Sequence, residues 1–111
     1  MFNREINPFQ VSDKITFRNV DKTLTLYVRS SASALVSGLQ NVQNLLKSID
    51  ENSTEFDRIN AARLFARCVF GEDQGDALVD FYNEPLAIIT VLGQYFEKRL
   101  AKKITKAQKK K

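Results

Sequence analysis

The hydrophobic pattern of the chain changes its period at Ser30, and this change limits the possible fold more than any other feature. Before Ser30, apolar side chains alternate with Thr, Lys and Arg in residues 14–18 and again in residues 23–29. Alternation combined with β-branched residues is typical of half-buried strands. Residues 19–22 between these segments supply turn-forming side chains, so we expect a β-hairpin over residues 13–29.

After Ser30, apolar residues recur every three or four positions, which is the spacing of one helix face. We expect a first helix capped by Ser30 or Ser31, and a second helix that begins near Ser53 or Thr54 and ends at Gly71. Residues 72–76 are expected to form an acidic turn, followed by about two helical turns over residues 77–82. Residues 83–85 then begin a last helix, because proline is favoured near the first helical position.

Together these patterns predict an α+β fold with a short N-terminal β-hairpin followed by a bundle of about four α-helices, the last one long and basic. A chain of 111 residues is within the usual size of one domain, so we expect residues 1–111 to form a single domain. Within it, residues 1–12 are expected to be an extended arm, residues 30–106 the helical part, and residues 107–111 a frayed basic tail.

Composition argues against an enzyme. The chain has no histidine, which removes the usual general base and the commonest metal ligand. Its acidic residues 72–80 do not have the ligand spacing of a calcium loop. Cys68 is expected to be a small buried hydrophobe, with a reactive thiol as the alternative if Arg63 and Arg67 lower its pKa. We expect no catalytic residues, no cofactor and no metal.

No stretch of the chain approaches 18 uninterrupted apolar residues, and the first residues contain no apolar signal segment. We therefore expect a cytoplasmic protein without a membrane partner.

Positive charge is concentrated at the C-terminal end. Residues 97–111 hold eight basic side chains and one acid, a net charge of +7, whereas the whole chain carries +4, which leaves −3 for the rest. Part of this charge suits the negative end of a helix dipole without any partner. The end is otherwise expected to dock on an acidic protein surface, with contact to nucleic acid phosphates as the alternative.

The expected contact residues lie on the hairpin and on the last helix. Aromatic side chains and the exposed part of the last helix would contact a partner, and nearby cations would surround them: Phe17, Tyr27, Phe96, Leu100, Ile104, Arg99, Lys102, Lys103 and Lys106. Because a lone hairpin is marginal in water, it must pack on helices or pair with another copy, so we also expect a homo-oligomer. In the nucleic-acid alternative, the binding residues would be Arg18, Arg29, Lys102, Lys103 and Lys106.

The order of these elements resembles that of the tail assembly chaperones of long-tailed bacteriophages. The residues that carry the resemblance are the two hairpin segments, the helix that follows at once, a junction that reads Val-Phe-Gly-Glu at residues 69–72, and the lysine-rich last helix. The resemblance spans roughly residues 13–111. It implies a small non-catalytic protein that binds the long helical tape-measure protein and helps recruit tail-tube subunits. Exposed apolar helix faces on such a partner would require apolar grooves on the chaperone.

Overall fold

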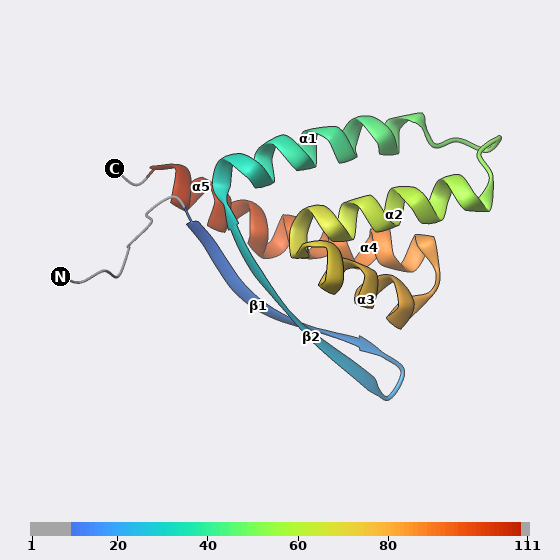
Figure 1. Cartoon of the computed structure of the whole chain (residues 1–111), viewed down its shortest axis with the longest axis horizontal. Helices are drawn as coiled ribbons and strands as arrows, with labels where there is room; N and C mark the ends of the chain where they lie inside the picture. The colour runs from blue at the N-terminus through green and yellow to red at the C-terminus, as the bar shows by residue number, and fades with distance from the viewer. Residues whose placement is uncertain (1–9, 110–111) are drawn as a thin grey trace.

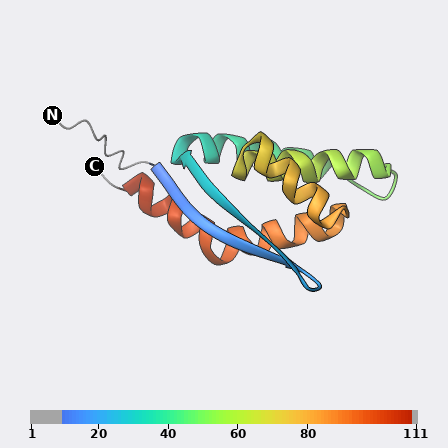
Figure 2. The same cartoon turned by 60° about the horizontal axis from the view of Figure 1, so that its bottom comes forward.

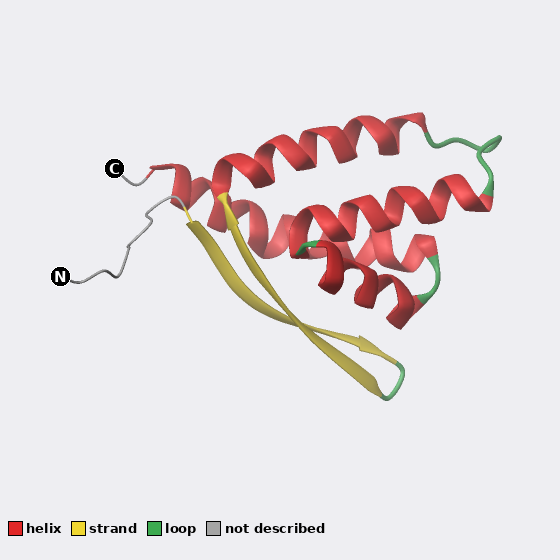
Figure 3. Cartoon of the chain, in the orientation of Figure 1, coloured by secondary structure: helices red, strands yellow, loops and turns green. Residues whose placement is uncertain are grey.

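The computed structural model describes residues 10–109, in which an antiparallel β-hairpin is followed by four helices, and it confirms the predicted α+β fold (Figures 1 and 3). The last helix is continuous from Pro85 to Lys109 but contains a π-helical segment, η1. The elements are β1 (Gln10–Asn19), β2 (Lys22–Ser31), α1 (Ala32–Ser48), α2 (Glu55–Phe70), α3 (Glu72–Tyr82), α4 (Pro85–Tyr95), η1 (Phe96–Leu100) and α5 (Ala101–Lys109).

The hairpin is longer than residues 13–29. Its register runs from Asn19 opposite Lys22 to Gln10 opposite Ser31, around a two-residue turn in which Val20 has a positive φ of 61°. The prediction of an extended arm over residues 1–12 is therefore wrong for residues 10–12. They join the strand because Val11 is buried in the core. Residues 1–9 of the predicted arm lie outside the described residues.

The two faces of the hairpin have different surroundings, as its alternating pattern predicts. Its inner face buries Val11, Phe17, Leu26 and Val28 against the helices, and its outer face is exposed. In Figure 2 the open end of the hairpin lies between the start of α1 and the C-terminal end of the last helix, and its turn projects beyond the last helix. Packing on the helices supplies the apolar cover that two strands cannot provide for themselves.

The helix ends follow the capping residues in the sequence. Ser31 accepts a hydrogen bond from the backbone of Ala34, and Thr54 forms a capping box with Asp57. The predicted acidic turn at residues 72–76 is wrong, because α3 begins at Glu72 directly after Gly71. Gly71 has a φ of 89°, so one residue reverses the chain between the two helices, and the acids fall in the first turns of α3 instead of a loop.

The last helix stays ordered further than predicted. Residues 107–109 are helical rather than frayed, because Ala107 is buried in the core where α5 packs against α1 and β1. Residues 110 and 111 lie outside the described part of the chain. Within η1, the N–H of Ala101 donates to the carbonyl of Phe96. This i→i+5 turn brings Tyr95 and Leu100, five residues apart, into the same core.

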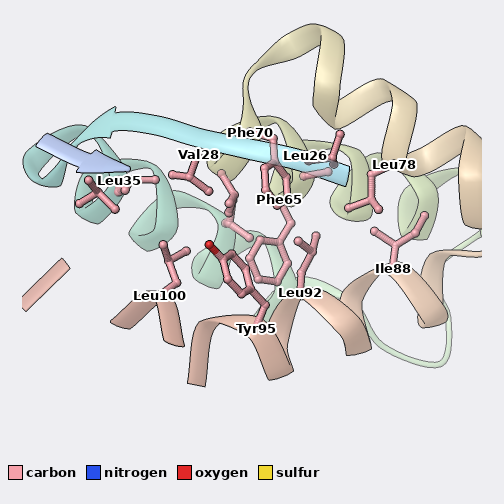
Figure 4. Close-up of a cluster of buried hydrophobic side chains, with 14 of the residues drawn as sticks. Leu26, Val28, Leu35, Phe65, Phe70, Leu78, Ile88, Leu92, Tyr95 and Leu100 are labelled. Atoms are coloured by element: carbon pink, nitrogen blue, oxygen red, sulfur yellow. The ribbon is translucent and has the colours of Figure 1, made fainter. Parts of the chain in front are cut away.

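One cluster of buried residues draws side chains from the hairpin and from every helix (Figure 4). Leu26 and Val28 of β2 lie opposite Tyr95 and Leu100 of the last helix, and Phe65 and Phe70 of α2 lie between them. Phe70 contacts the Phe17 ring edge-on and stacks on the Tyr95 ring, with centroids 5.8 and 6.2 Å apart. These three rings join the first strand, the second helix and the last helix.

Close contact between α2 and α3 depends on glycine. A Cβ atom placed on Gly75 would lie 2.7 Å from the backbone N and Cα of Arg67. Backbone atoms cannot move aside as a side chain can, so any larger residue at position 75 would push the two helices apart.

We expect Gly75→Ala to lower the free energy of unfolding by about 1–3 kcal/mol through this overpacking. The matched control is Gly93→Ala in α4, where an added Cβ would meet nothing within 4 Å. Alanine favours the helix there by up to about 1 kcal/mol, so this variant should be as stable as the wild type or more stable. Urea unfolding followed by circular dichroism measures both. Equal stability of the two variants would contradict the close packing.

Candidate functional site

An apolar groove lies between α1 and the C-terminal part of the last helix. It has a volume of about 410 Å³. Half-buried side chains from both helices form its walls, and the buried Ile104 and Phe65 lie deeper in it. The lining residues are Val36, Leu39, Gln40, Val42, Gln43, Leu46, Phe65, Phe96, Ala101, Ile104 and Thr105.

The groove has polar residues on both sides. Gln40 and Gln43 of α1 are exposed on one wall. On the other side, Ala101 and Thr105 also belong to a shallow hollow lined by the exposed Lys102 and Lys106. An apolar channel between two helices, with a cationic border, has the shape and charge to take the apolar face of a third helix whose flank is acidic.

The structure divides the apolar residues that the sequence indicated for partner contact. Leu100, Ile104 and Phe17 are 0%, 5% and 6% exposed, so the prediction that they lie on an exposed contact surface is wrong. They continue the apolar stripes of their elements, and those stripes face the core. Ile104 still borders the groove from within, and the half-buried Phe96 lines it directly. Tyr27 is 42% exposed but belongs to the hairpin rather than to the groove.

The predicted cations of the last helix also separate into two groups. Lys102 and Lys106 are exposed beside the groove. Arg99 and Lys103 instead approach Asp13 of β1, at 2.7 Å and 3.8 Å. Part of the positive charge therefore holds the hairpin to the last helix, and the other part is available to a partner.

Asp13 is the most buried charged group in this arrangement, with a side chain 4% exposed. Its carboxylate accepts hydrogen bonds from the Tyr95 hydroxyl and the Arg99 guanidinium, both at 2.7 Å. Burial alone would raise the pKa of Asp13, but these hydrogen bonds, the Lys14 backbone N–H and the nearby cations outweigh it, so the pKa is lowered. Burial and the Asp13 carboxylate raise the pKa of the Tyr95 hydroxyl.

A second carboxylate, Asp76, joins α2 to α3. It receives two hydrogen bonds from Arg67 at 2.8 Å and one from Arg63 at 3.0 Å. The hydrogen bonds from Arg67 are the main reason why the pKa of Asp76 falls to about 2. Arg63 and Arg67 are bound to Asp76, and burial raises the pKa of the Cys68 thiol. The two arginines therefore do not activate this thiol, as the reactive-thiol alternative required.

Sequence reasoning missed the α1 side of the groove. The predicted contact residues lay only on the hairpin and the last helix, whereas Val36, Leu39 and Leu46 of α1 also line the groove. Their spacing predicts an apolar helix face but does not tell whether that face is covered by the core or left beside a groove.

Among residues 10–109, no cluster of three or more His, Cys, Asp or Glu side chains could hold a metal ion. The described helices are each too short or too polar to cross a membrane. No protein-family model, curated protein or solved structure matches the chain.

We expect the stability of the protein to fall as the pH drops from about 4 to about 2. Asp13 and Asp76 both have lowered pKa values in the folded chain, so the unfolded chain binds protons more readily there. Their contribution is complete above the unfolded value of about 3.9 and is lost as the pH falls toward the folded values.

Asp76→Asn tests this expectation. The variant should be less stable than the wild type at pH 7, and its unfolding free energy should change less between about pH 4 and pH 2. The control, Asp21→Asn in the hairpin turn, should keep the wild-type slope, because Asp21 is exposed. Urea titrations at several pH values give the slopes. An unchanged slope for Asp76→Asn would contradict the role of its ion pairs.

Proposed function

We propose that the chain is a non-catalytic binding protein that takes an amphipathic helix with an acidic flank into the groove between α1 and α5. The observation that carries this proposal is the groove itself, an apolar channel bordered by Lys102 and Lys106. Burial of an apolar helix face would supply the affinity, and the lysines would select the acidic flank and set its orientation.

The more specific form of the proposal is a phage tail assembly chaperone that binds the tape-measure protein and helps recruit tail-tube subunits. Two observations support it: the hairpin followed by four helices agrees with the element order of the resemblance, and the groove suits a partner made of long helices. A protein of this kind would protect apolar helix faces before assembly, which requires a binding surface and no nucleotide or metal chemistry.

The nucleic-acid alternative has less support. Its five cations are divided between the hairpin and α5, and Lys103 is already directed to Asp13. Arg29 lies over the Tyr27 ring at 5.8 Å from the centroid, so both side chains have a contact within the protein. Binding to a single-stranded oligonucleotide that weakens steeply with salt would favour this alternative.

The groove is tested with a synthetic amphipathic helical peptide that has leucines on one face and glutamates on its flank. We expect Thr105→Trp, which fills the groove, to weaken binding at least about tenfold, a loss of about 1.4 kcal/mol. Gln108→Trp is the matched control, because Gln108 is exposed on the same helix and does not line the groove. Fluorescence anisotropy measures both affinities. Equal binding by the two variants would exclude the groove as the site.

Charge selection is tested with Lys102→Glu combined with Lys106→Glu. We expect this double variant to bind the acidic-flanked peptide about tenfold more weakly at low salt and to show little further loss at high salt. Lys22→Glu combined with Lys98→Glu is the control, because it makes the same charge change at exposed positions away from the groove. Equal losses in both double variants would mean that net charge, rather than the groove border, controls binding.

The chaperone form is tested by co-production with the protein encoded by the neighbouring open reading frame. We expect that frame to encode a very long, helix-rich protein that stays in the soluble fraction only when the wild-type chain is present. Thr105→Trp should reduce its recovery and Gln108→Trp should not. A neighbouring frame of another kind would refute the chaperone proposal while leaving the groove result intact.

A further inference from the structure

The outer edge of β2 is closed by a side chain at Tyr27. The Tyr27 backbone N–H donates to the Gln74 side-chain oxygen at 2.9 Å, and the Gln74 amide nitrogen donates to the Tyr27 carbonyl at 2.8 Å. Gln74, which also donates to the Phe70 carbonyl at 3.0 Å, thus occupies the place of a peptide group from a third strand. Gln74 therefore blocks the middle of this edge, so an added strand cannot pair continuously along β2.

The same contacts also show which backbone groups point outward on the opposite edge of the hairpin, along β1. Since both Tyr27 backbone groups point away from β1, the Lys14–Tyr27 pair is a non-hydrogen-bonded pair of the ladder. Alternation along β1 then directs the backbone groups of Ser12, Thr16 and Arg18 outward as well. The close Thr16–Thr25 hydroxyl contact of 2.8 Å across the strands agrees with this phase.

Most of this β1 edge has no partner within the described residues. The Tyr82 hydroxyl donates to the Arg18 carbonyl at 2.8 Å, and the Lys14 N–H lies toward the Asp13 carboxylate. The backbone N–H and carbonyl groups of Ser12 and Thr16 have no hydrogen-bond partner among residues 10–109. Within the described part of the chain, the outward backbone groups of these two residues are therefore open to an added strand.

Charge indicates which strand would fit. The outer face of the hairpin carries Lys14, Arg18 and Arg29, and the register places no acid on it. Beneath β1, on the last helix, Arg99 and Lys103 pair with Asp13, so these three groups keep a net charge of +1 there. An added strand beside β1 would therefore lie mainly beside the cations of the outer face.

We propose that the open edge of β1 binds an extended segment of another protein, with acidic side chains at alternate positions, as a third strand. The backbone rungs at Ser12 and Thr16 would hold this segment, and its acids would lie beside Lys14 and Arg18. A second copy of the chain fits less well, because antiparallel pairing of two β1 edges brings these cations of both copies together. The edge is separate from the groove and adds a second binding mode.

A fluorescent nine-residue peptide of alternating glutamate and threonine is the probe. We expect it to bind the full chain at low salt, and a lysine–threonine peptide of equal length not to bind. Ser12→Pro should weaken binding at least about tenfold, because proline removes an outward N–H while leaving the β1–β2 ladder intact. Ser12→Ala should bind as the wild type does. Thr105→Trp should also bind normally, which separates this edge from the groove.

Amide hydrogen exchange of the wild-type chain gives a test that needs no variant. The peptide should slow exchange of the Ser12 and Thr16 amides. The Ile15 amide, whose N–H points toward β2, should exchange at an unchanged rate. Absence of peptide binding, equal binding of the lysine peptide, or full binding by folded Ser12→Pro would overturn the proposal. The proposal would also be overturned if a higher protein concentration, without peptide, slowed exchange at Ser12 and Thr16. That result would show that a second copy of the chain occupies the edge.

Discussion

The structure depends on covering one face of a two-stranded hairpin. Two strands cannot protect their own apolar side chains from water, so the helices must supply that cover. Phe17 and Val28 meet Phe70, Tyr95 and Leu100 in one core, which joins the first strand to the last helix. Burial of this face therefore sets the positions of elements far apart in the sequence, and with them the walls of the groove.

Polar contacts give this packing a defined register. Asp13 points inward from β1 and is satisfied by Tyr95 and Arg99, which the last helix presents one turn apart. A buried carboxylate without these partners would be costly, so the hairpin can lie on the helix in few other positions. Asp76 does the same for α2 and α3 through Arg63 and Arg67. The contacts of Asp13 consume Arg99 and Lys103, two cations that the sequence alone would assign to a partner.

Both proposed surfaces follow from this arrangement. α1 and α5 are held apart on one side by the core, which leaves an apolar channel beside Lys102 and Lys106. On the hairpin, Gln74 blocks the β2 edge at Tyr27, whereas the backbone groups of Ser12 and Thr16 on the β1 edge have no partner within residues 10–109. The same small chain could thus receive a helix and a strand at two separate places.

The sequence by itself determined the order of the elements and the ends of the first two helices, because period, caps and Gly71 act locally. The full length of the hairpin and of the last helix depended on packing, since Val11 and Ala107 are buried in the core. The sequence indicated the two-faced hairpin, the first two helices and the basic last helix. Only the tertiary structure decided which apolar residues remain accessible. Leu100 and Ile104 belong to the same stripe as Phe96, and no local pattern tells which part of a stripe a distant strand or helix will cover. Which cations stay available to a partner was equally non-local, because Arg99 and Lys103 bind Asp13, which lies more than eighty residues earlier in the chain.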